Sequence, residues 1–266
     1  GKRGLVRVDF NVPLDGERVT DDTRIRAALP TLRWLLENGA SGVLMSHLGR
    51  PKGKPDARYS LKPVAARLAE LLGQEVATAP DCVGPEVEAL AQGLKPGQVL
   101  LLENVRFHAA ETDNDSDFAR ALAGLGDFFV NDAFGSAHRA HASTTGVAGF
   151  LPAAAGLLME KELLELGSLV LAPQAPFVVL LGGAKVGDKI GVMENLIGKA
   201  DRILIGGGMA FPFLKARGLE IGRSLCEEDL DVPRRIEAKA RGTRTELFLP
   251  LDVVVASEFA EGAPHR

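Results

Sequence analysis

Short apolar runs alternate along the chain with longer stretches in which apolar residues recur every three or four positions. The short runs predict buried β-strands, and the periodic stretches predict amphipathic helices. We predict strands at 5–8, 43–46, 99–102, 128–130, 177–181 and 202–205, a weaker strand at 75–79, and one or two more within 246–256. We predict helices at 25–36, 63–72, 85–92, 117–123, 153–171, 190–197, 210–216 and 233–240.

The alternation of strands and helices predicts an α/β protein in which parallel sheets are covered by helices on both faces. The longest helical stretch, 153–171, separates two such series. We therefore expect two doubly wound, Rossmann-like domains joined by a long helix, the second domain being incomplete. The expected boundaries are 1–152, a connector at 153–172, and 173–266. Pro30 interrupts the first helical pattern and predicts a kink or two short helices.

Composition narrows the class of protein. The 266 residues are 46% hydrophobic and 25% charged, as expected of a globular protein with room for two domains. A net charge of −4, with one Trp and one Tyr, disfavours a nucleic-acid-binding protein. No apolar run reaches the roughly 20 residues that span a membrane. Cys82 and Cys226 form no CxxC motif, which favours reduced thiols and, with no signal-peptide pattern, a cytoplasmic location.

Polar and basic side chains follow the predicted strands of the first series, at the point where each strand ends. Ligands of open α/β sheets bind outside the carboxyl ends of the strands, and arginine suits phosphate and carboxylate recognition. Any one arginine alone is more simply an ordinary surface residue. Their convergence on one edge predicts a pocket for a small, multiply charged anion. The residues expected there are Asp9, Asn11, Arg24, His47, Arg50, Arg106, His138, Arg139 and His141.

The loop after the second strand shows how this interpretation depends on its neighbours. It carries Arg50, Lys52 and Lys54, with no acid before Asp56. Taken alone, it is best explained as a solvated basic loop. Taken with the other loops, it forms one wall of the predicted anion pocket.

The second series carries a different anion-binding element. Residues 182–189, Gly-Gly-Ala-Lys-Val-Gly-Asp-Lys, follow a strand and open a helix, so backbone N–H groups can approach phosphates. The loop is similar to a Walker A loop, but Asp188 stands where lysine is required. The triple glycine at 206–208 also ends a strand and suits either a bound nucleotide or a tight turn. His138 and His141 have no partners that complete a metal site, so no metal-ligating residues are predicted.

Taken together, the ordered motifs along the chain resemble those of phosphoglycerate kinase, of the bacterial type. The motifs are Arg-Val-Asp-Phe-Asn-Val-Pro (7–13), Asp-Asp-Thr-Arg-Ile (21–25), Ser-His-Leu-Gly-Arg-Pro (46–51), Leu-Leu-Glu-Asn-Val-Arg-Phe (101–107), Asn-Asp-Ala-Phe-Gly-Ser-Ala-His-Arg (131–139), Gly-Gly-Ala-Lys-Val-Gly-Asp-Lys-Ile (182–190) and Ile-Gly-Gly-Gly-Met-Ala-Phe (205–211).

The resemblance implies a monomeric glycolytic kinase that transfers a phosphoryl group reversibly between 1,3-bisphosphoglycerate and ADP, giving 3-phosphoglycerate and ATP. It implies that Mg²⁺ is bound with the nucleotide. The implied phosphoglycerate-binding residues are Asp9, Asn11, Arg24, His47, Arg50, Arg106 and Arg139. The implied nucleotide-binding residues are Gly183, Ala184, Lys185, Lys189 and Gly207.

The chemistry of this reaction agrees with the residues present. The acceptor in the ATP-consuming direction is a carboxylate, which is already ionised at neutral pH, so no general base is required. The step needs alignment and neutralisation of charge on the moving phosphoryl group. We expect Arg24 and Lys185 to supply that charge. Because the two sites lie on either side of the helix at 153–171, we also expect the domains to close during the reaction.

The chain departs from the family pattern at a few positions. Gly4 replaces an aliphatic residue and is expected to weaken the first strand, and Ala110 replaces a glycine. Family members continue beyond Arg266 with further nucleotide contacts, and both ends of this chain look cut. The sequence is therefore either an incomplete record or a true fragment, and a fragment is expected to bind 3-phosphoglycerate weakly and turn over little.

Two other classes of function stay open on the residues alone. A dehydrogenase would share the fold, but the only Gly-x-Gly resembling its fingerprint, at 124–126, precedes a strand instead of following one. A non-catalytic anion-binding module would need the first site and not the lysines of the second.

Overall fold

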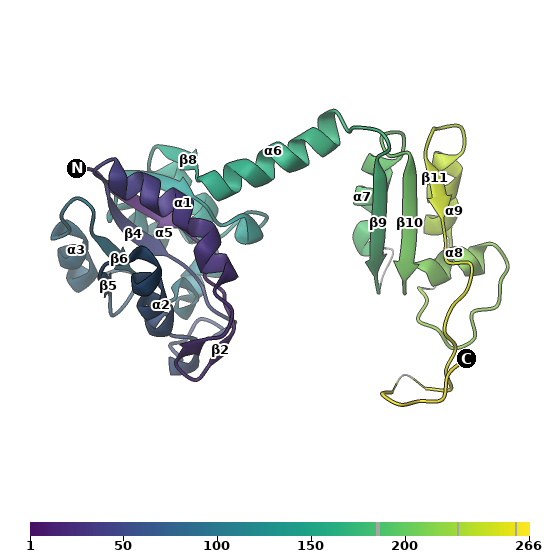
Figure 1. The fold of residues 1–266 in the computed structure, drawn as a ribbon, viewed down its shortest axis with the longest axis horizontal. Coiled ribbons are helices and arrows are strands. Elements are labelled where there is room, and N and C mark those ends of the chain that lie inside the picture. Colours follow the sequence, from purple (N-terminus) through teal and green to yellow (C-terminus); the bar gives the residue numbers. More distant parts are fainter. Residues whose placement is uncertain (185–186, 228, 259) are drawn as a thin grey trace. The chain divides into compact units, whose positions relative to one another are not determined.

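The computed structural model describes residues 1–184, 187–227, 229–258 and 260–266. These residues form two compact units, Gly1–Leu164 and Glu165–Arg266. The boundary between the units falls within helix α6 (Leu157–Leu171), drawn in green in Figure 1.

The first unit is built on a six-stranded parallel sheet with the strand order β5-β6-β4-β1-β7-β8. Its strands are β1 (Arg3–Arg7), β4 (Ser41–Met45), β5 (Val76–Thr78), β6 (Val99–Leu101), β7 (Phe128–Asn131) and β8 (Ala153–Ala155). A small hairpin joins β2 (Leu14–Asp15) to β3 (Arg18–Val19). The α-helices are α1 (Thr23–Glu37), α2 (Lys62–Leu72), α3 (Pro85–Gln92), α4 (Ala109–Thr112) and α5 (Ser116–Ala123). Short 3₁₀ turns are η1 (Ala57–Tyr59), η2 (Val105–Phe107), η3 (Phe134–Ser136) and η5 (Val147–Gly149), and η4 (Ala142–Gly146) is a π-turn.

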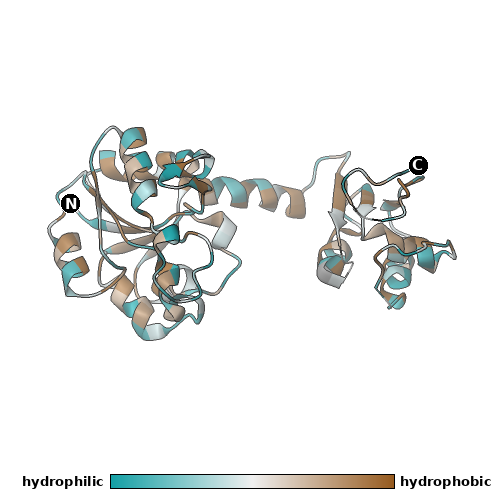
Figure 2. Ribbon diagram, turned by 90° about the horizontal axis from the view of Figure 1, so that it is seen from below, coloured by the Kyte–Doolittle hydropathy of each residue, from teal (hydrophilic) through white to brown (hydrophobic). Residues whose placement is uncertain are grey.

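Helices cover both faces of this sheet, and each face has its own hydrophobic core. Val6 of β1 packs in the core that contains α1 and α2, whereas its neighbour Leu5 packs in the core that contains α3 and α5. Successive residues of a strand point to opposite faces, so β1 is buried on both sides. Figure 2 shows hydrophobic strands flanked by helices that carry both hydrophobic and hydrophilic residues. The predicted α/β class with parallel sheets is confirmed.

The structure explains why glycine, and not an aliphatic residue, stands at position 4 of β1. A side-chain Cβ at this position would lie 2.9 Å from the ring of Phe128 on the neighbouring strand β7. The aromatic ring therefore occupies the space that an aliphatic side chain on β1 would need.

Of the two outcomes predicted at Pro30, a division into two short helices is wrong, because α1 runs without interruption from Thr23 to Glu37. Pro30 lies on the exposed side of the helix. A proline inside a helix costs about 3 kcal/mol. Burying each large aliphatic side chain on the opposite face contributes about 1.5–3 kcal/mol. Ile25, Leu29, Leu32 and Leu35 are all buried on that face, so packing outweighs the lost hydrogen bond.

The predicted start of the long helix is also wrong. Residues Ala153–Ala155 form strand β8, which pairs in parallel with β7 at the edge of the sheet, and the helix begins only at Leu157. Alanine favours helices, but this preference is worth only tenths of a kilocalorie per residue. Backbone pairing with β7 overrides it.

Two side chains from other elements cap the start of α6. The backbone N–H of Leu157 donates to the hydroxyl of Thr31 in α1 at 2.9 Å. The N–H groups of Leu158 and Met159 donate to Oδ1 of Asp132, directly after β7, at 3.0 and 3.2 Å. A Cβ at Gly156 would lie 2.2 Å from the same carboxylate oxygen, so only glycine fits before the helix. The helix start is thereby fixed to α1 and to the end of β7.

We expect Asp132→Ala to lower the free energy of unfolding of the first unit by about 1–2 kcal/mol, because two helix N–H groups lose their acceptor. Asp132→Asn keeps an oxygen acceptor and is expected to retain most of the stability. Burial raises the pKa of the Asp132 carboxyl, although hydrogen bonds from Thr31, Met159 and Leu158 oppose that shift, so a neutral amide suits the position. Trp34, the only tryptophan of the chain, lies in α1 and reports urea unfolding of this unit by fluorescence. Equal losses in the two variants would show that the cap does not act through its oxygen.

The second unit has a three-stranded parallel sheet in the order β11-β10-β9. Its elements are β9 (Val178–Gly183), η6 (Gly187–Lys189), α7 (Ile190–Leu196), β10 (Arg202–Gly207), α8 (Ala210–Ala216), α9 (Asp231–Ala240) and β11 (Glu246–Phe248). Met193, Ile203, Phe213 and Ile236 are buried in its core.

Strand formation ends early in the last predicted segment. Only Glu246–Phe248 pairs with β10, and 249–255 form no strand. Pro250 lacks the N–H that a ladder needs, and Leu251 is fully exposed. Across the part of the chain that the structure describes, no helix is both long enough and apolar enough to cross a membrane.

Candidate functional site

A pocket of about 260 Å³ lies at the carboxyl ends of the strands of the first unit. All of the predicted phosphoglycerate-binding residues line this pocket, and it also includes three residues that the sequence analysis did not name. The lining residues are Asp9, Asn11, Arg24, His47, Gly49, Arg50, Arg106, Gly135, Ser136 and Arg139. His138 and His141 are not among them, so the structure does not bring these two predicted residues into the pocket.

The topology of the sheet explains this convergence. Parallel strands end at the same edge, so the segments that follow them meet there. Asp9 and Asn11 follow β1, His47 and Arg50 follow β4, Arg106 lies in η2 after β6, Arg139 follows β7, and Arg24 stands in the first turn of α1.

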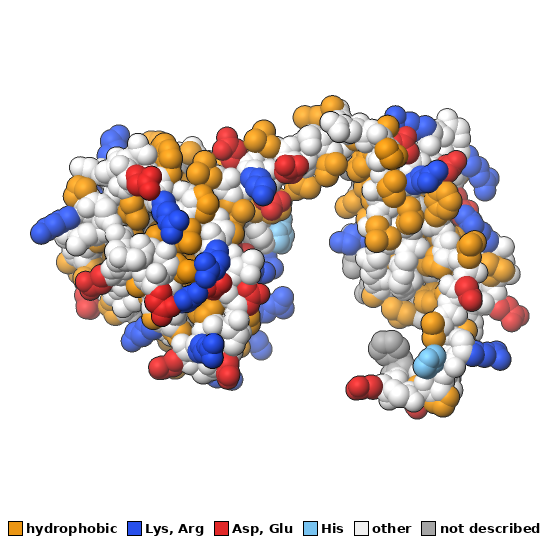
Figure 3. Space-filling view, viewed as in Figure 1, with side chains coloured by type: hydrophobic (Ala, Val, Ile, Leu, Met, Phe, Trp, Pro, Cys, Tyr) orange, Lys and Arg blue, Asp and Glu red, His pale blue; other side chains and the backbone are white. Residues whose placement is uncertain are grey.

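The pocket has a strong excess of positive charge. Four arginines line it, and Asp9 is the only acid in its lining. Nη1 of Arg24 lies 3.0 Å from both carboxylate oxygens of Asp9, and the Arg24 side chain is 52% exposed. Burial, together with the charges of Arg139 and Arg7, lowers the pKa of Arg106. Figure 3 shows acidic and basic side chains interspersed over the visible faces of both units.

Glycines allow the backbone to approach the pocket closely. Gly49 has a φ of +59°, and a Cβ there would lie 2.4 Å from the ring of Tyr59. Its N–H donates to the side chain of Asn11 at 2.9 Å, and its carbonyl accepts from Nη1 of Arg106, also at 2.9 Å. At Gly135, a Cβ would lie 2.5 Å from a carboxylate oxygen of Asp9. A larger residue at Gly135 would displace Asp9 of the pocket, and one at Gly49 would displace Tyr59.

Asn104 connects the loops that carry Arg50 and Arg106. Its buried side-chain amide donates to the carbonyls of Leu48 and Tyr59 at 2.8 and 2.9 Å. Its side-chain oxygen accepts from the N–H of Arg106 at 3.1 Å. The position of Arg106 is therefore tied to the loop after β4.

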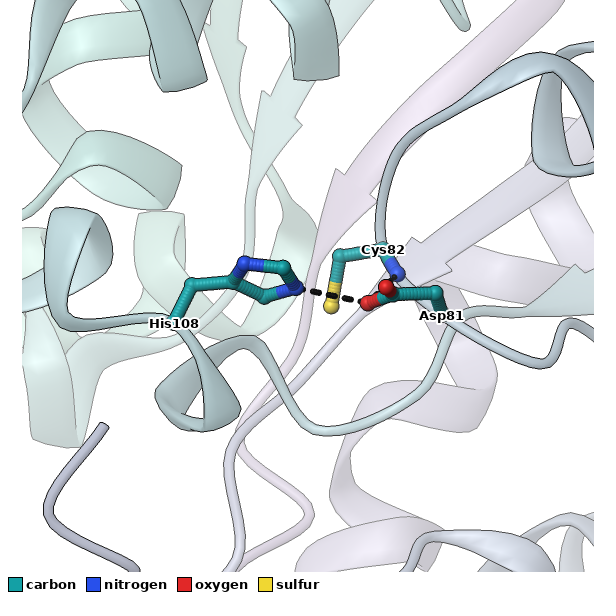
Figure 4. Close-up of side chains that lie close together, drawn as sticks. All are labelled: Asp81, Cys82 and His108. Carbon is teal, nitrogen blue, oxygen red and sulfur yellow. Dashed lines mark hydrogen bonds and ion pairs between the residues drawn. The ribbon is translucent and has the colours of Figure 1, made fainter. Parts of the chain in front are cut away.

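A second contact holds the other end of the Arg106 loop. Figure 4 shows Asp81, Cys82 and His108 close together, with Nε2 of His108 2.6 Å from Oδ1 of Asp81. The Cys82 thiol donates to the carbonyl of Glu103 at 3.0 Å. Burial, and then the charges of Asp81, Glu103 and Glu111, raise the pKa of Cys82, so the thiol stays protonated. Metal binding requires the thiolate, and these groups already have partners, so we interpret the cluster as a structural contact.

A buried polar network lies behind the pocket. Nη2 of Arg7 is 3.1 Å from Nδ1 of His47, and Nε of Arg7 donates to the hydroxyl of Ser143 at 2.8 Å. The hydroxyl and N–H of Ser143 donate to the two oxygens of Glu111 at 2.7 and 2.9 Å. Arg7 and Glu111 are both completely buried.

The sequence analysis did not assign a role to Arg7. This residue ends a strand that has helices on both faces. A charge at a central strand position must then find a buried partner. Arg7 belongs to the quoted motif 7–13, and a charge within a doubly covered strand is the signal that identifies it.

Burial and the neighbouring arginines together determine the charge state of His47. Burial is the largest cause that lowers its pKa, followed by the charges of Arg7, Arg106, Arg139 and Arg24, and together they bring it to about 2. The imidazole is therefore neutral at physiological pH.

This shift predicts a pH dependence of stability. Below about pH 6.5 the unfolded chain protonates His47, whereas the folded protein does not until about pH 2, so stability falls as the pH falls through this window. We expect His47 to contribute an extra loss of about 2 kcal/mol between pH 7 and pH 5. Urea titrations followed by Trp34 fluorescence, in wild type and His47→Gln, measure the difference. Parallel loss of stability in the two proteins would contradict it.

The predicted nucleotide-binding glycines also come together. Gly183 and Gly207 are register partners at the ends of β9 and β10, and the N–H of Met209 donates to the carbonyl of Gly183 at 3.0 Å. Gly207 has a φ of +63°, and a Cβ at the next residue, Gly208, would lie 3.0 Å from the carbonyl of Ala184. These strand ends are therefore free of side-chain bulk.

Of the two lysines predicted to bind the nucleotide, the structure describes only Lys189. Lys189 ends η6, directly before α7. Lys185 lies outside the described residues. The N–H of Gly187 donates to a carboxylate oxygen of Glu227 at 3.2 Å, so a backbone amide of this loop already engages a negatively charged group.

Comparison with known proteins gives the family. A family model described as phosphoglycerate kinase matches residues 1–266. The chain belongs to the phosphoglycerate kinase family. It is 59% identical over 266 residues to the phosphoglycerate kinase of Moorella thermoacetica, covering 100% of this chain and 68% of that relative. It is 60% identical over 270 residues to that of Chloroflexus aurantiacus, with the same coverage.

Solved structures agree with this assignment. The phosphoglycerate kinase of Coxiella burnetii superposes with a TM-score of 0.85 at 42% identity, covering 100% of this chain and 67% of that one. That of Pyrococcus horikoshii OT3 superposes with a TM-score of 0.80 at 33% identity, covering 96% and 66%. The chain thus spans about two thirds of the length of these phosphoglycerate kinases.

The predicted resemblance is therefore confirmed over the whole chain. Phosphoglycerate kinases are glycolytic phosphotransferases, and the family implies reversible phosphoryl transfer between 1,3-bisphosphoglycerate and ADP. Membership also implies that the substrates are a phosphoglycerate and ADP or ATP.

Proposed function

We propose that the pocket of the first unit binds 3-phosphoglycerate and 1,3-bisphosphoglycerate through Asp9, Asn11, Arg24, His47, Arg50, Arg106 and Arg139. The observation that carries this proposal is that all of these side chains line one cavity of about 260 Å³ with a single acid among four arginines. Such a cavity suits a small ligand that carries several negative charges. Bidentate guanidinium groups recognise both phosphate and carboxylate.

We assign the four arginines to two roles. Arg106 is buried and held by Gly49, and with His47, the exposed Arg50 and the half-buried Arg139 it is assigned to the phosphate that is not transferred. Arg24 is half exposed and paired with Asp9, which places its guanidinium at the rim of the pocket. Arg24 is therefore the arginine we assign to the moving phosphoryl group.

The transfer step requires charge neutralisation and no proton transfer. The carboxylate of 3-phosphoglycerate is ionised at neutral pH and attacks directly. The only histidine in the pocket lining has a pKa of about 2, which makes it a poor general base. Fixed positive charges stabilise a phosphoryl transition state most effectively when they are preorganised in a site that excludes water.

The second unit is proposed to bind the nucleotide as its Mg²⁺ complex. Gly183, Ala184 and Gly207 form the surface next to the phosphates, and Lys185 and Lys189 add positive charge. The support is the pair of glycine ends of β9 and β10 together with a loop that opens α7. Mg²⁺ would be held by the nucleotide phosphates next to this loop and would supply positive charge there.

The substrate-binding pocket can be tested by comparing Arg50 with its basic neighbours. Lys52 and Lys54 are exposed and do not line the pocket, although they belong to the same loop. Arg50→Ala is expected to weaken 3-phosphoglycerate binding by about 10- to 100-fold, as for loss of a hydrogen bond between charged groups. Lys52→Ala with Lys54→Ala is expected to weaken it by about 3-fold or less.

Isothermal titration calorimetry at low and high salt measures both effects. The effect of the lysine variant is expected to shrink at high salt, because exposed charges are screened. Equal losses in the two variants would contradict a built phosphate site and would favour a diffuse basic surface.

We also propose a domain organisation of 1–152, a connector at 153–172 and 173–266, in which the two sites approach each other only when both substrates are bound. The support is that the phosphoglycerate and nucleotide residues belong to separate compact units. Closure would exclude water from the phosphoryl group. Small-angle scattering with 3-phosphoglycerate and Mg·ATP together is expected to give a smaller radius of gyration than either ligand alone. Identical curves under all conditions would rule out closure.

We further propose that the protein is a cytoplasmic monomer that binds neither nucleic acid nor membranes. A net charge of −4 with low aromatic content, and two free cysteines, support this proposal.

A further inference from the structure

The contact between Arg7 and His47 determines which nitrogen of the imidazole carries its proton. An arginine guanidinium has only N–H donors and no acceptor. Nη2 of Arg7 lies 3.1 Å from Nδ1 of His47. Nδ1 must therefore accept this hydrogen bond, and the single proton of the neutral ring resides on Nε2.

We propose that Arg7 is a positioning residue for phosphoglycerate binding, holding His47 as the neutral Nε2–H tautomer so that the ring offers one N–H donor to the ligand. This inference rests on the proposed function of the pocket. Arg7 itself does not line the pocket and acts through His47.

The strongest charge effects on His47 favour the neutral form. They come from Arg7 behind the imidazole and from Arg106, Arg139 and Arg24 on other elements, whereas Asp9 is the acid in the same pocket lining. A second proton on Nδ1 would also face the N–H of Arg7. His47 therefore contributes a directed hydrogen bond to an anionic ligand, and the arginines contribute the charge.

Each of the other hydrogen bonds in the buried network behind the pocket also has a defined direction. Burial would raise the pKa of Glu111, but hydrogen bonding to His141, the charge of Arg7 and hydrogen bonds from Ser143 lower it overall, so Glu111 is ionised and only accepts. The Ser143 hydroxyl donates to Glu111 and accepts from Nε of Arg7. Nη1 of Arg7 donates to the carbonyl of Val8. Hydrogen-bond donation thus diverges from Arg7, toward Nδ1 of His47 on one side and through Ser143 to the acceptor-only carboxylate of Glu111 on the other.

Nitrogen-15 NMR of the histidine-labelled wild-type protein tests the tautomer directly. The chain has five histidines, and His47→Gln identifies the signals of His47. We expect an unprotonated Nδ1 and a protonated Nε2, unchanged from pH 5 to pH 8. A protonated Nδ1, or an imidazolium within this range, would overturn the proposal.

A double-mutant comparison tests the consequence for binding. Arg7→Met with Glu111→Gln removes both charges of the buried pair, so no uncompensated charge remains inside. We expect this change to weaken 3-phosphoglycerate binding by about 10-fold. We also expect the His47 imidazole to populate both neutral tautomers, because no donor then holds Nδ1 as an acceptor. In the His47→Gln background we expect a further change of less than about 2-fold, because Arg7 acts through the imidazole.

The matched control removes another ion pair from the same strand. Arg3 in β1 pairs with Asp127 at 3.5 Å, and neither residue lines the pocket. Arg3→Met with Asp127→Asn is expected to leave the affinity unchanged. Equal loss with and without His47 would show that Arg7 acts through the general field of the site, and would overturn the proposal. Failure of wild type to bind 3-phosphoglycerate would instead refute the proposed function and leave the NMR result to decide the tautomer.

Discussion

The parallel pairing of β1 with β4 on one side and β7 on the other is the constraint on which the site depends. It brings the segments after these strands to one edge, where their backbone amides and side chains meet. The same pairing encloses β1 between two helical layers, so the side chain of Arg7 at the end of this strand cannot reach solvent. The architecture that collects the pocket arginines therefore also requires an internal partner for Arg7, and Glu111 supplies it through the hydroxyl of Ser143.

Concentrating arginines has an electrostatic cost that the surrounding residues limit. Like charges in a partly desolvated pocket repel, and the free protein must hold them before any anion arrives. Asp9 compensates Arg24 at the rim, and Glu111 compensates Arg7 in the interior. His47 remains neutral and adds no further positive charge. The pocket thus keeps enough positive charge to attract a phosphate while remaining compatible with a folded domain.

Much of the fold and of the first site could be predicted from the sequence, because both depend on local patterns. Apolar runs mark the strands, and the rule that ligands bind at their carboxyl ends places residues such as Arg50 and Arg106 at one edge, where the structure has them. The errors have non-local causes. Ala153 joins a sheet through a strand distant in sequence, Pro30 is tolerated because of packing on the opposite face, and the burial of Arg7 depends on helices that cover both sides. Pattern alone cannot weigh such tertiary contacts against local preference.

The caps of α6 have a mechanical consequence. Thr31 lies on the helix whose first turn carries Arg24, and Asp132 directly precedes the segment that carries Arg139. The base of α6 is thus clamped to the two elements that present these arginines. A helix of 15 residues is about 22 Å long, so a tilt of about 3° at its clamped end would displace the other end by about 1 Å. A small shift of α1 or of the segment after β7 would therefore tilt α6. Even a shift that leaves the contacts of the pocket intact would displace the far end of this helix by a distance similar to a bond length.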